Sequence, residues 1–272
     1  MARGFDAAGQ VAVVTGGGSG IGAALCRLFA RSGVRGVVVA DLDHERAQQV
    51  ADAINRDHTG CPAHGVELDV ADSRSVEALV EQVETEVGPI AAWCSNAGVH
   101  MGDALGDADD WRKSFDVNVM GHVNAARSVI PRMARRKAGH IVITASAAGL
   151  LTDFRCAPYA ASKHAAVALA EWLSITHADD GVSISCVCPE GVRTGMTRPD
   201  SLKAGVSSNF LEPEDVAREI LETLKTRCFL VLPHSKVAKY EQRRAADREK
   251  WLDRMRAARR RLTQTIPSAV AS

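Results

Sequence analysis

Short apolar runs alternate with longer amphipathic stretches along most of this chain. Each apolar run has the length of a buried strand. The predicted strands are residues 10–15, 36–40, 63–68, 90–94, 140–144, 181–187 and 228–232. Helical spacing is found in residues 23–32, 45–56, 73–87, 109–133 and 159–176, and Glu212-Pro213-Glu214 opens one more helix. Strands that alternate with helices predict an α/β fold, with a doubly wound parallel sheet of about seven strands flanked by helices.

Local signals mark some ends of these elements. Ser73 is a residue type that caps helix N-termini, and Gly88-Pro89 ends the helix that it opens. Residues 150–158 lack a regular pattern and are predicted to be an irregular connection. No linker or change of composition divides residues 1–233, so we predict a single domain there.

Residues 234–272 differ from the rest and are predicted to form a basic helical C-terminal extension. The helical pattern from Lys236 to Leu262 contains eleven basic and four acidic residues. Its apolar edge consists of Val237, Tyr240, Trp251, Leu252 and Met255. We expect this edge to dock on the same subunit or on a partner subunit. Contact with nucleic acid or a membrane is the alternative.

The composition is typical of a soluble globular protein. Of the 272 residues, 46% are hydrophobic, and the formal net charge of zero gives no indication of a nucleic-acid partner. No apolar run reaches the roughly 20 residues that span a bilayer. The first ten residues lack the apolar core of a signal peptide. We therefore expect a cytoplasmic protein without a membrane span.

The cysteines are scattered along the chain and none has the spacing of a zinc site. There are seven, namely Cys26, Cys61, Cys94, Cys156, Cys186, Cys188 and Cys228. We predict reduced, buried thiols and no metal site. Cys186 and Cys188 lie two apart on a predicted strand, so they point the same way but are poorly placed for a disulfide.

A glycine-rich segment follows the first predicted strand and leads into a helix. It reads Gly16-Gly17-Gly18-Ser19-Gly20-Ile21-Gly22. Glycines let the backbone turn tightly against a phosphate, and the helix N-terminus offers it free N–H groups. The segment fits a dinucleotide fingerprint in two registers, Gly18-x-Gly20-x-x-Ala23 and Thr15-Gly16-x-x-x-Gly20-x-Gly22. It predicts a dinucleotide site on a Rossmann-like sheet.

Asp41 ends the second predicted strand, about 20 residues beyond the glycines, where an acid binds a ribose 2′-hydroxyl. A carboxylate repels a 2′-phosphate, and neither Leu42 nor the glycine-rich segment is basic. Both observations favour NAD over NADP. Arg46 could reach a 2′-phosphate, which would favour NADP. The alternative role of Asp41 is to cap the following helix.

Polar and small residues follow three further strands, at the edge where open α/β sheets bind ligands. They are Asp69-Val70, Ser95-Asn96-Ala97-Gly98 and Ser146. Asn118 lies among apolar residues within the predicted helix 109–133, so its amide requires hydrogen-bond partners. Asn118 is either structural, or it bends this helix and holds a water.

Tyr159 and Lys163 lie four residues apart in a predicted helix and share one face. Tyrosine is a poor acid–base group near neutral pH because its ordinary pKa is about 10. A nearby cation favours the phenolate and lowers that pKa. The pair fits a proton-transfer device, whereas the alternative is a chance pair of surface residues.

Together these motifs resemble the short-chain dehydrogenase/reductase family, and the resemblance covers residues 10 to about 233. The motifs are Thr15-Gly-Gly-Gly-Ser-Gly-Ile-Gly22, Asp69-Val70, Asn96-Ala-Gly98, Asn118, Ser146 and Tyr159-Ala-Ala-Ser-Lys163. The resemblance implies that residues 1–233 form an NAD(P)-binding catalytic domain. It also selects Gly16, Gly20 and Gly22 as the register of the glycines.

The resemblance further implies a role for each candidate site residue. Tyr159 would be the general acid/base, and Lys163 would lower its pKa and hold the nicotinamide ribose. Ser146 would hydrogen-bond the substrate oxygen, and Asn118 would hold the water of a proton relay. The cofactor would be contacted by Gly16, Ser19, Gly20, Ile21, Gly22, Asp41, Asp69, Val70, Asn96, Ala97, Gly98, Tyr159, Lys163, Pro189, Val192 and Thr194.

Two positions depart from the family pattern. Ser95 stands where the family usually has asparagine, and Glu190 separates Pro189 from Gly191, where glycine usually follows the proline directly. The later residues of that turn are retained, so we expect cofactor binding to survive. The Glu190 carboxylate either contacts the substrate or points to solvent.

These features predict an oxidoreductase that transfers a hydride between NAD and a secondary alcohol or ketone, with alcohol oxidation favoured. An NADP-dependent carbonyl reductase is one alternative, and a non-catalytic dinucleotide sensor or scaffold is another. The complete set of Asn118, Ser146, Tyr159 and Lys163 argues against a sensor, which needs no acid–base group.

The segments that should line the substrate pocket are apolar at Leu150, Leu151, Phe154, Met196 and Leu211. They favour a hydrophobic substrate, unless they serve packing. The resemblance also implies a homotetramer or homodimer, with the helices of residues 109–133 and 159–176 at one interface.

Overall fold

A computed structural model describes residues 9–58, 60–197 and 210–265 of the chain. Within these residues a seven-stranded parallel sheet has the strand order β3-β2-β1-β4-β5-β6-β7. The strands are β1 Val11–Thr15, β2 Gly36–Asp41, β3 Ala63–Glu67, β4 Ile90–Ser95, β5 Gly139–Thr144, β6 Val182–Val187 and β7 Leu230–Val231. This confirms the predicted Rossmann-like parallel sheet, although the last strand is shorter than residues 228–232.

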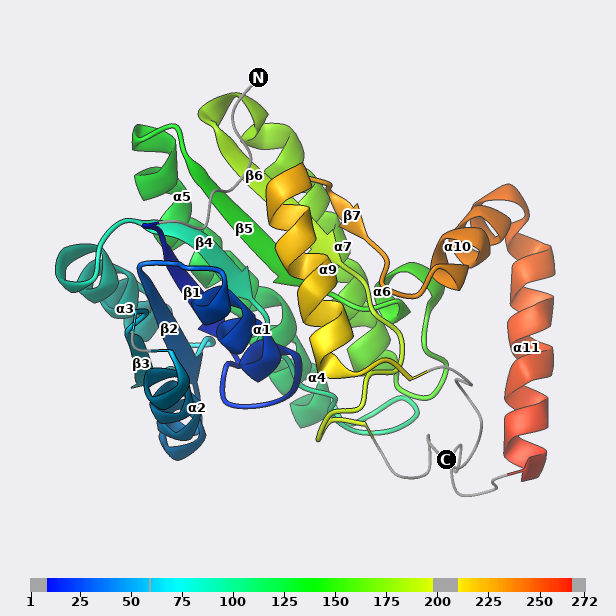
Figure 1. Cartoon of the computed structure of the whole chain (residues 1–272). Helices are drawn as coiled ribbons and strands as arrows, with labels where there is room; N and C mark the ends of the chain where they lie inside the picture. Colours follow the sequence, from blue (N-terminus) through cyan, green and yellow to red (C-terminus); the bar gives the residue numbers. More distant parts are fainter. Residues whose placement is uncertain (1–8, 59, 198–209, 266–272) are drawn as a thin grey trace.

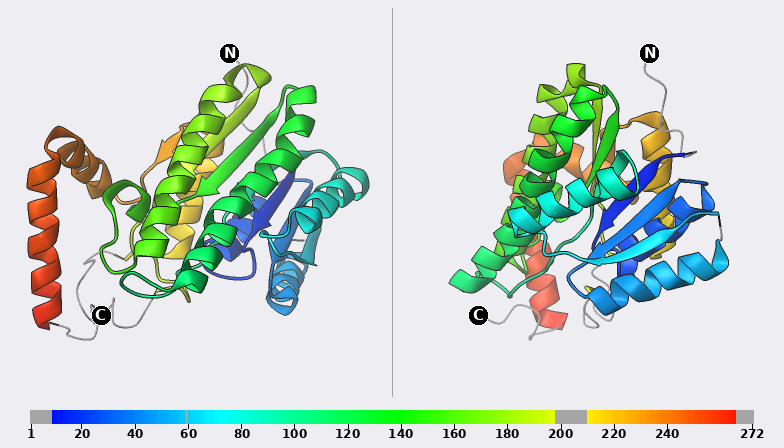
Figure 2. Two further views of the ribbon diagram at one scale, coloured as in Figure 1. Left: turned by 180° about the vertical axis from the view of Figure 1, so that it is seen from behind. Right: turned by 90° about the vertical axis from the view of Figure 1, so that its left-hand side faces the viewer.

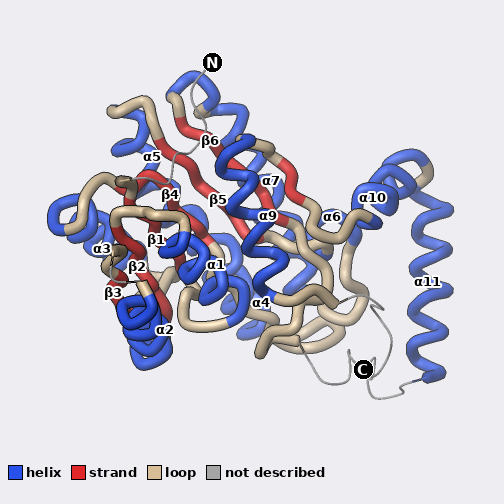
Figure 3. The backbone as a smooth tube through the Cα atoms, in the orientation of Figure 1, coloured by secondary structure: helices blue, strands red, loops and turns tan. Residues whose placement is uncertain are grey.

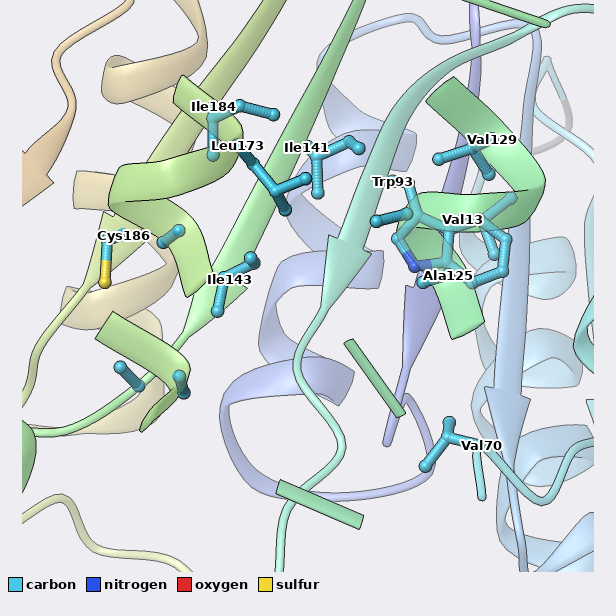
Figure 4. Packing of buried hydrophobic residues seen from close by; sticks show 14 of the residues in the cluster. Val13, Val70, Trp93, Ala125, Val129, Ile141, Ile143, Leu173, Ile184 and Cys186 are labelled. Atoms are coloured by element: carbon cyan, nitrogen blue, oxygen red, sulfur yellow. The ribbon is translucent and has the colours of Figure 1, made fainter. Parts of the chain in front are cut away.

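The inner strands are largely apolar because helices cover both faces of the sheet, whereas the edge strand β3 is only partly buried. Successive residues of a strand face opposite sides. β1 accordingly places Val11 and Val13 in one core cluster, and Ala12 and Val14 in the other. Figure 4 shows the first cluster, where Trp93 packs beside Val13 and Val129.

Each core cluster is closed by helices that are amphipathic in sequence. α1 Gly20–Arg31, α2 His44–Asp57 and α9 Pro213–Thr226 cover one face. α3 Ser73–Glu86, α5 Gly121–Arg135 and α7 Ala157–Thr176 cover the other, which faces the viewer in the left panel of Figure 2. The remaining elements are α4 Ala108–Phe115, η1 Asp116–Met120, α6 Ala148–Leu151, η2 Ala178–Asp180, α10 Lys236–Ala246 and α11 Arg248–Thr265.

The predicted helix 109–133 is interrupted in the structure. Residues of η1 form a π-helix between α4 and α5, and Asn118 lies within it. π-helical turns of this kind occur mostly at functional sites. The chain is helical from Ala108 to Arg135, as predicted for residues 109–133, but it contains a π-helical turn at Asn118.

Three local predictions are wrong. Asp72, not Ser73, caps α3, because the Asp72 side chain accepts a hydrogen bond from the Arg74 N–H. The expected irregular connection from residue 150 to 158 begins with the end of α6 and runs into α7. The helix of the extension is broken at Asp247, which has an extended backbone, into α10 and α11.

The extension packs on its own chain through part of its apolar edge. Val237 is fully buried and Trp251 is 7% exposed, and both belong to the first core cluster. Leu252 is 38% exposed. In Figures 1 and 2, α10 lies beside α6 while α11 projects away from the sheet. The division into a domain of residues 1–233 and an extension of residues 234–272 stays a prediction.

All seven cysteines are free thiols. Six are buried as predicted, but Cys228 is exposed. The Sγ atoms of Cys186 and Cys188 lie 3.8 Å apart, so they share a side of β6 without a disulfide.

The sheet places the candidate site at one edge. All strands are parallel, so their carboxyl ends lie on the same side, and Figure 3 shows loops gathered there. The strand order reverses between β1 and β4, and open α/β sheets bind ligands in the crevice at such a point.

Candidate active site

The glycine-rich segment is packed so closely that side chains are excluded from it. Gly16 has a φ of +64°, and a Cβ there would lie 2.9 Å from the Cα of Ala97. A Cβ on Gly22 would lie 2.1 Å from the carbonyl oxygen of Gly16. At both positions an added Cβ would collide with main-chain atoms. The first turn of α1 can therefore approach β1 only with glycine at these positions.

A cavity of about 510 Å³ lies between this segment and the loop that carries residues 193–197. It is lined by Gly18, Ser19, Gly20, Ala23, Arg27, Arg193, Thr194, Gly195, Thr197, Pro213 and Glu214. Ser19 precedes α1 without capping it through its side chain. The first N–H groups of α1 and two arginines therefore make this cavity suitable for an anionic group such as a pyrophosphate. Ile21 instead packs against the second core cluster.

Asp41 reaches from the end of β2 to the glycine-rich segment. Its Oδ2 accepts a hydrogen bond of 2.9 Å from the Gly18 N–H, and its Oδ1 accepts one of 3.1 Å from the Asp43 N–H. α2 is capped by Asp43, which excludes the alternative that Asp41 is the cap. Arg46 forms an exposed ion pair of 3.0 Å with Asp43.

Asp69 and Val70 follow β3, beside the end of β2. The Leu68 N–H donates to the carbonyl oxygen of Asp41, which joins the two strand ends. Asp69 accepts a hydrogen bond from the Ala71 N–H. Val70 is 8% exposed, and Asn124 of α5 donates to its carbonyl oxygen.

Thr15 connects the two turns that flank the reversal of strand order, and sequence reasoning missed its role. Its Oγ1 accepts hydrogen bonds of 3.0 Å from the Asn96 N–H and 3.1 Å from the Ala97 N–H. The side-chain amide of Asn96 donates in return to the carbonyl oxygen of Thr15. Thr15 is 1% exposed, so these bonds are shielded from water.

Asn118 fixes the chain just beyond the Asn96-Ala97-Gly98 turn. Its Oδ1 accepts from the Val99 N–H at 2.8 Å, and its Nδ2 donates to the Val99 carbonyl oxygen at 2.9 Å. The same Nδ2 donates to Ser162 Oγ at 3.0 Å. Because both ends of the amide are engaged, a relay water at this position would have to be held by main-chain atoms.

Lys163 is buried at the centre of the site. Its Nζ donates a hydrogen bond of 3.0 Å to the Thr144 carbonyl oxygen and lies 5.8 Å from the ring centroid of Tyr159. A Cβ on Gly98 would lie 3.3 Å from this Nζ. Burial lowers the pKa of Lys163 to about 8.

Burial also acts on Tyr159, and it raises the pKa of the phenol to about 12. A hydrogen bond with Ser146 opposes this rise without cancelling it. The net shift is opposite to the one expected from a nearby lysine alone. The free protein therefore holds Tyr159 protonated at neutral pH.

Ser146 connects Tyr159 to the turn that follows β6. Its Oγ accepts from the Ala148 N–H at 3.1 Å and donates to the Pro189 carbonyl oxygen at 3.4 Å. Val192 and Thr194 follow in the same turn, where Val192 is buried and Thr194 lines the cavity.

Three further residues lie near Tyr159: the sequence reasoning missed His100 and Arg155, and it placed Asp153 only in a stretch expected to line the pocket. The ring centroid of His100 lies 4.6 Å from that of Tyr159. Arg155 and Asp153 form an ion pair of 2.6 Å, and Asp153 raises the pKa of Tyr159 while Arg155 lowers it. The position of His100, two residues beyond Gly98, was the available signal.

Ser95 has a partner that compensates for its departure from the family pattern. Its Oγ lies 2.7 Å from Nδ1 of His122, and both residues are buried. Burial lowers the pKa of His122 to about 3, so the imidazole is neutral.

The apolar residues predicted to line a substrate pocket have different surroundings. Leu150 and Leu151 belong to the first core cluster, and Leu211 packs against the second. Met196 is 47% exposed. The expectation of a hydrophobic substrate therefore rests on Phe154 and Met196.

The described residues contain no group of three or more His, Cys, Asp or Glu side chains that could hold a metal ion. Of the helices that the structure describes, none has both the length and the apolar character needed to cross a membrane.

Comparison with known proteins gives one consistent family. A family model described as short chain dehydrogenase matches residues 10–204. Meso-2,3-butanediol dehydrogenase of Serratia marcescens is 35% identical over 217 residues, which cover 76% of this chain and 84% of that enzyme. 1-deoxy-11-beta-hydroxypentalenate dehydrogenase of Streptomyces exfoliatus is 35% identical over 236 residues, with 83% of each chain covered.

A solved structure agrees with these relatives. A short chain dehydrogenase/reductase from Burkholderia phymatum, in complex with NAD, superposes with a TM-score of 0.83 at 33% identity. The match covers 90% of this chain and 96% of that one.

Proposed function

The chain belongs to the short-chain dehydrogenase family, and we propose that it oxidises a secondary alcohol with NAD as the hydride acceptor. An oxidoreductase acting on CH–OH groups follows from the family. The choice of NAD and the direction of reaction are the proposal. The choice of NAD rests above all on Asp41 beside the glycine-rich segment, and the proton transfer rests on the convergence of Tyr159, Lys163 and Ser146 beside the Gly98 turn.

The residues at the sheet edge fit a dinucleotide. The glycine-rich segment forms a cradle that a Cβ would fill, and α1 directs its free N–H groups at the adjoining cavity. Asp41 would bind the adenosine ribose, Asp69 and Val70 would flank the adenine, and Lys163 would hold the second ribose. Bound NAD would accept the hydride from the alcohol carbon.

The protein's own residues move the proton. Ser146 Oγ would position the alcohol oxygen, and Tyr159 would take its proton as general base. The pKa of about 12 in the free protein is too high for this task near neutral pH. The ammonium group of Lys163, 5.8 Å from the ring centroid of Tyr159, would favour the phenolate during the reaction. The main chain of Asn118 would hold the relay water, since its side chain is engaged with Val99 and Ser162.

Two contacts support NAD over NADP. The carboxylate of Asp41 lies 2.9 Å from the Gly18 N–H, close to where a 2′-phosphate would add negative charge. Arg46, which could otherwise pair with that phosphate, is paired with Asp43. The related structure from Burkholderia phymatum was solved with NAD.

Steady-state assays of purified protein with graded secondary alcohols test the proposal. Reduction of NAD with at least one alcohol, at higher kcat/KM than with NADP, is the expected result. A clear preference for NADPH and a ketone in the unmodified protein would instead establish the carbonyl reductase alternative.

Assembly into a homotetramer or homodimer is part of the proposal. Trp172 and Ile175 of α7 are 58% and 79% exposed, and Met120 of η1 is 42% exposed. Large apolar side chains exposed on the two elements predicted to form an interface support their burial by a second subunit.

A further inference from the structure

Glu190, which stands where the family usually has glycine after the proline, lies in a turn that touches both halves of the active site. In this 189–194 turn, the Pro189 carbonyl oxygen accepts hydrogen bonds from the Ala147 N–H at 2.8 Å and from Ser146 Oγ at 3.4 Å. At the other end of the turn, Thr194 lines the cavity opposite Gly20. Any displacement of the turn therefore moves Ser146 relative to the cofactor cavity.

The side chain of Glu190 points neither at that cavity nor at open solvent. Its Oε2 lies 2.9 Å from Nζ of Lys236, the first residue of α10, and the two side chains are 17% and 36% exposed. The geometry is a close ion pair without an aligned hydrogen bond. The Glu190 N–H also donates to Nδ1 of His234, which is 4% exposed. Glu190 is thus bound on both its backbone and its side chain by residues 234–236.

The segment that holds Glu190 is itself firmly anchored. Val237, next to Lys236, is fully buried in the first core cluster, and its N–H donates to the His234 carbonyl oxygen. The rings of Tyr240 and Trp251 lie 6.2 Å apart between α10 and α11. Because these apolar contacts fix α10, Lys236 presents its charge from a defined position.

α10 also reaches the other two elements of the catalytic site. It packs against α6, which starts two residues after Ser146. Arg244 Nη2 lies 3.3 Å from Nε2 of His164, the neighbour of Lys163 in the chain. α10 therefore contacts the 189–194 turn, α6 and α7, which carry or adjoin Ser146 and Lys163.

We infer that α10 is a positioning element of the active site, and that the Glu190–Lys236 ion pair couples it to the 189–194 turn. The expected effect of this ion pair on cofactor binding rests on the proposed function. The coupling itself is a property of the free protein. Glu190 and Lys236 act here through the turn and through Ser146, and neither is a catalytic residue.

The structure offers a matched set of variants for the test. Glu190→Gln removes the negative charge at the same side-chain length, and Lys236→Gln removes the positive charge while it keeps a polar side chain. The double variant Glu190→Lys/Lys236→Glu restores opposite charges, and a glutamate suits the first position of a helix. Lys239→Gln removes an exposed charge from the same helix and serves as the control.

Hydrogen exchange of the Ala147, Glu190 and Arg193 amides measures the coupling without any ligand. We expect each single variant to exchange these amides about tenfold faster, a loss of roughly 1.4 kcal/mol. The charge-swapped variant should recover most of the protection, and Lys239→Gln should match wild type. NADH titrations of the same proteins should show a parallel tenfold loss of affinity and the same recovery.

These readouts separate the inference from the proposed function. Faster exchange in the single variants, together with no NADH binding by wild type, would contradict the proposed function and leave the coupling intact. Exchange and affinity equal to wild type in both single variants would overturn the inference. Equal effects of Lys236→Gln and Lys239→Gln would overturn it too. If Glu190→Gln fails to fold, the comparison of Lys236→Gln with Lys239→Gln still tests the inference, which requires a larger effect of Lys236→Gln.

Discussion

Replacement of Asn118 by alanine tests how the interrupted helix holds the active site. The variant removes three hydrogen bonds, to the Val99 N–H, the Val99 carbonyl oxygen and Ser162 Oγ. A buried polar group left without a partner costs about 1–3 kcal/mol. Val99 is partly exposed, so water would satisfy part of the loss. We therefore expect the free energy of unfolding to fall by roughly 2–4 kcal/mol, which corresponds to a lower Tm by about 4–16 °C.

The same variant should also weaken cofactor binding. Val99 directly follows the Asn96-Ala97-Gly98 turn, and that turn packs against Gly16 and Lys163. Release of Val99 should loosen it and weaken NADH binding about tenfold, or by roughly 1.4 kcal/mol. Denaturant unfolding and NADH titration of the same preparation measure the two quantities.

Asn55 supplies the matched control. Its amide binds the backbone of Ala63 in the same two-sided manner, with Nδ2 donating to the carbonyl oxygen and Oδ1 accepting from the N–H. Ala63 begins β3, at the edge of the sheet away from the site. Asn55→Ala should lose about 1–2 kcal/mol of stability and keep its NADH affinity. The reasoning is refuted if Asn118→Ala is as stable as wild type, or if both variants lose affinity equally.

Three further outcomes are expected. Asp41→Ala should weaken NAD binding about tenfold, whereas NADP binding should improve. Titrations with both cofactors measure the two affinities. An unchanged ratio of these affinities would show that Asp41 does not select the cofactor. Burial lowers the pKa of Lys163 from 10.5 to about 8, so between these pH values the unfolded chain binds a proton that the folded protein has released. The unfolding free energy of wild type, relative to Lys163→Met, should therefore rise by roughly 3 kcal/mol across that window, and a flat difference would contradict the burial argument. Ile175→Glu should shift the protein to smaller species in sedimentation velocity, whereas a monomeric wild type would disprove the proposed interface.

Most of the fold was predictable because its signals are local. Most buried strands consist mainly of apolar residues, as in β2, and the covering helices bury periodic apolar positions. The order of the elements then leaves few topologies. The position of the site at the strand ends follows from the same pattern, because glycine, asparagine and aspartate interrupt the runs there.

Errors arose where a residue's partner is distant in the sequence. Thr15 looks like the last residue of an apolar strand, and its bonds to the 96–97 backbone exist only after β1 and β4 pair. The helical pattern from residue 109 to 133 does not specify the π-helical turn of η1, and the bonds of Asn118 in this turn reach Val99, 19 positions earlier.

Glu190 illustrates the same limit in the site itself. The sequence allowed a carboxylate that contacts substrate or points to solvent, and the structure instead pairs it with Lys236, 46 positions later. A charge can be identified from one residue, but its effect depends on the partners that the fold brings to it.

Replacement of Tyr159 by phenylalanine tests the proposed mechanism most directly. The variant keeps the ring that lies against His100 and removes only the hydroxyl that would move the proton. We expect turnover of the best secondary alcohol to fall by at least about 100-fold, while the NADH affinity and the Tm stay close to those of wild type. Turnover equal to that of wild type, with the same alcohol and NAD, would contradict the assignment of Tyr159 as the acid–base group.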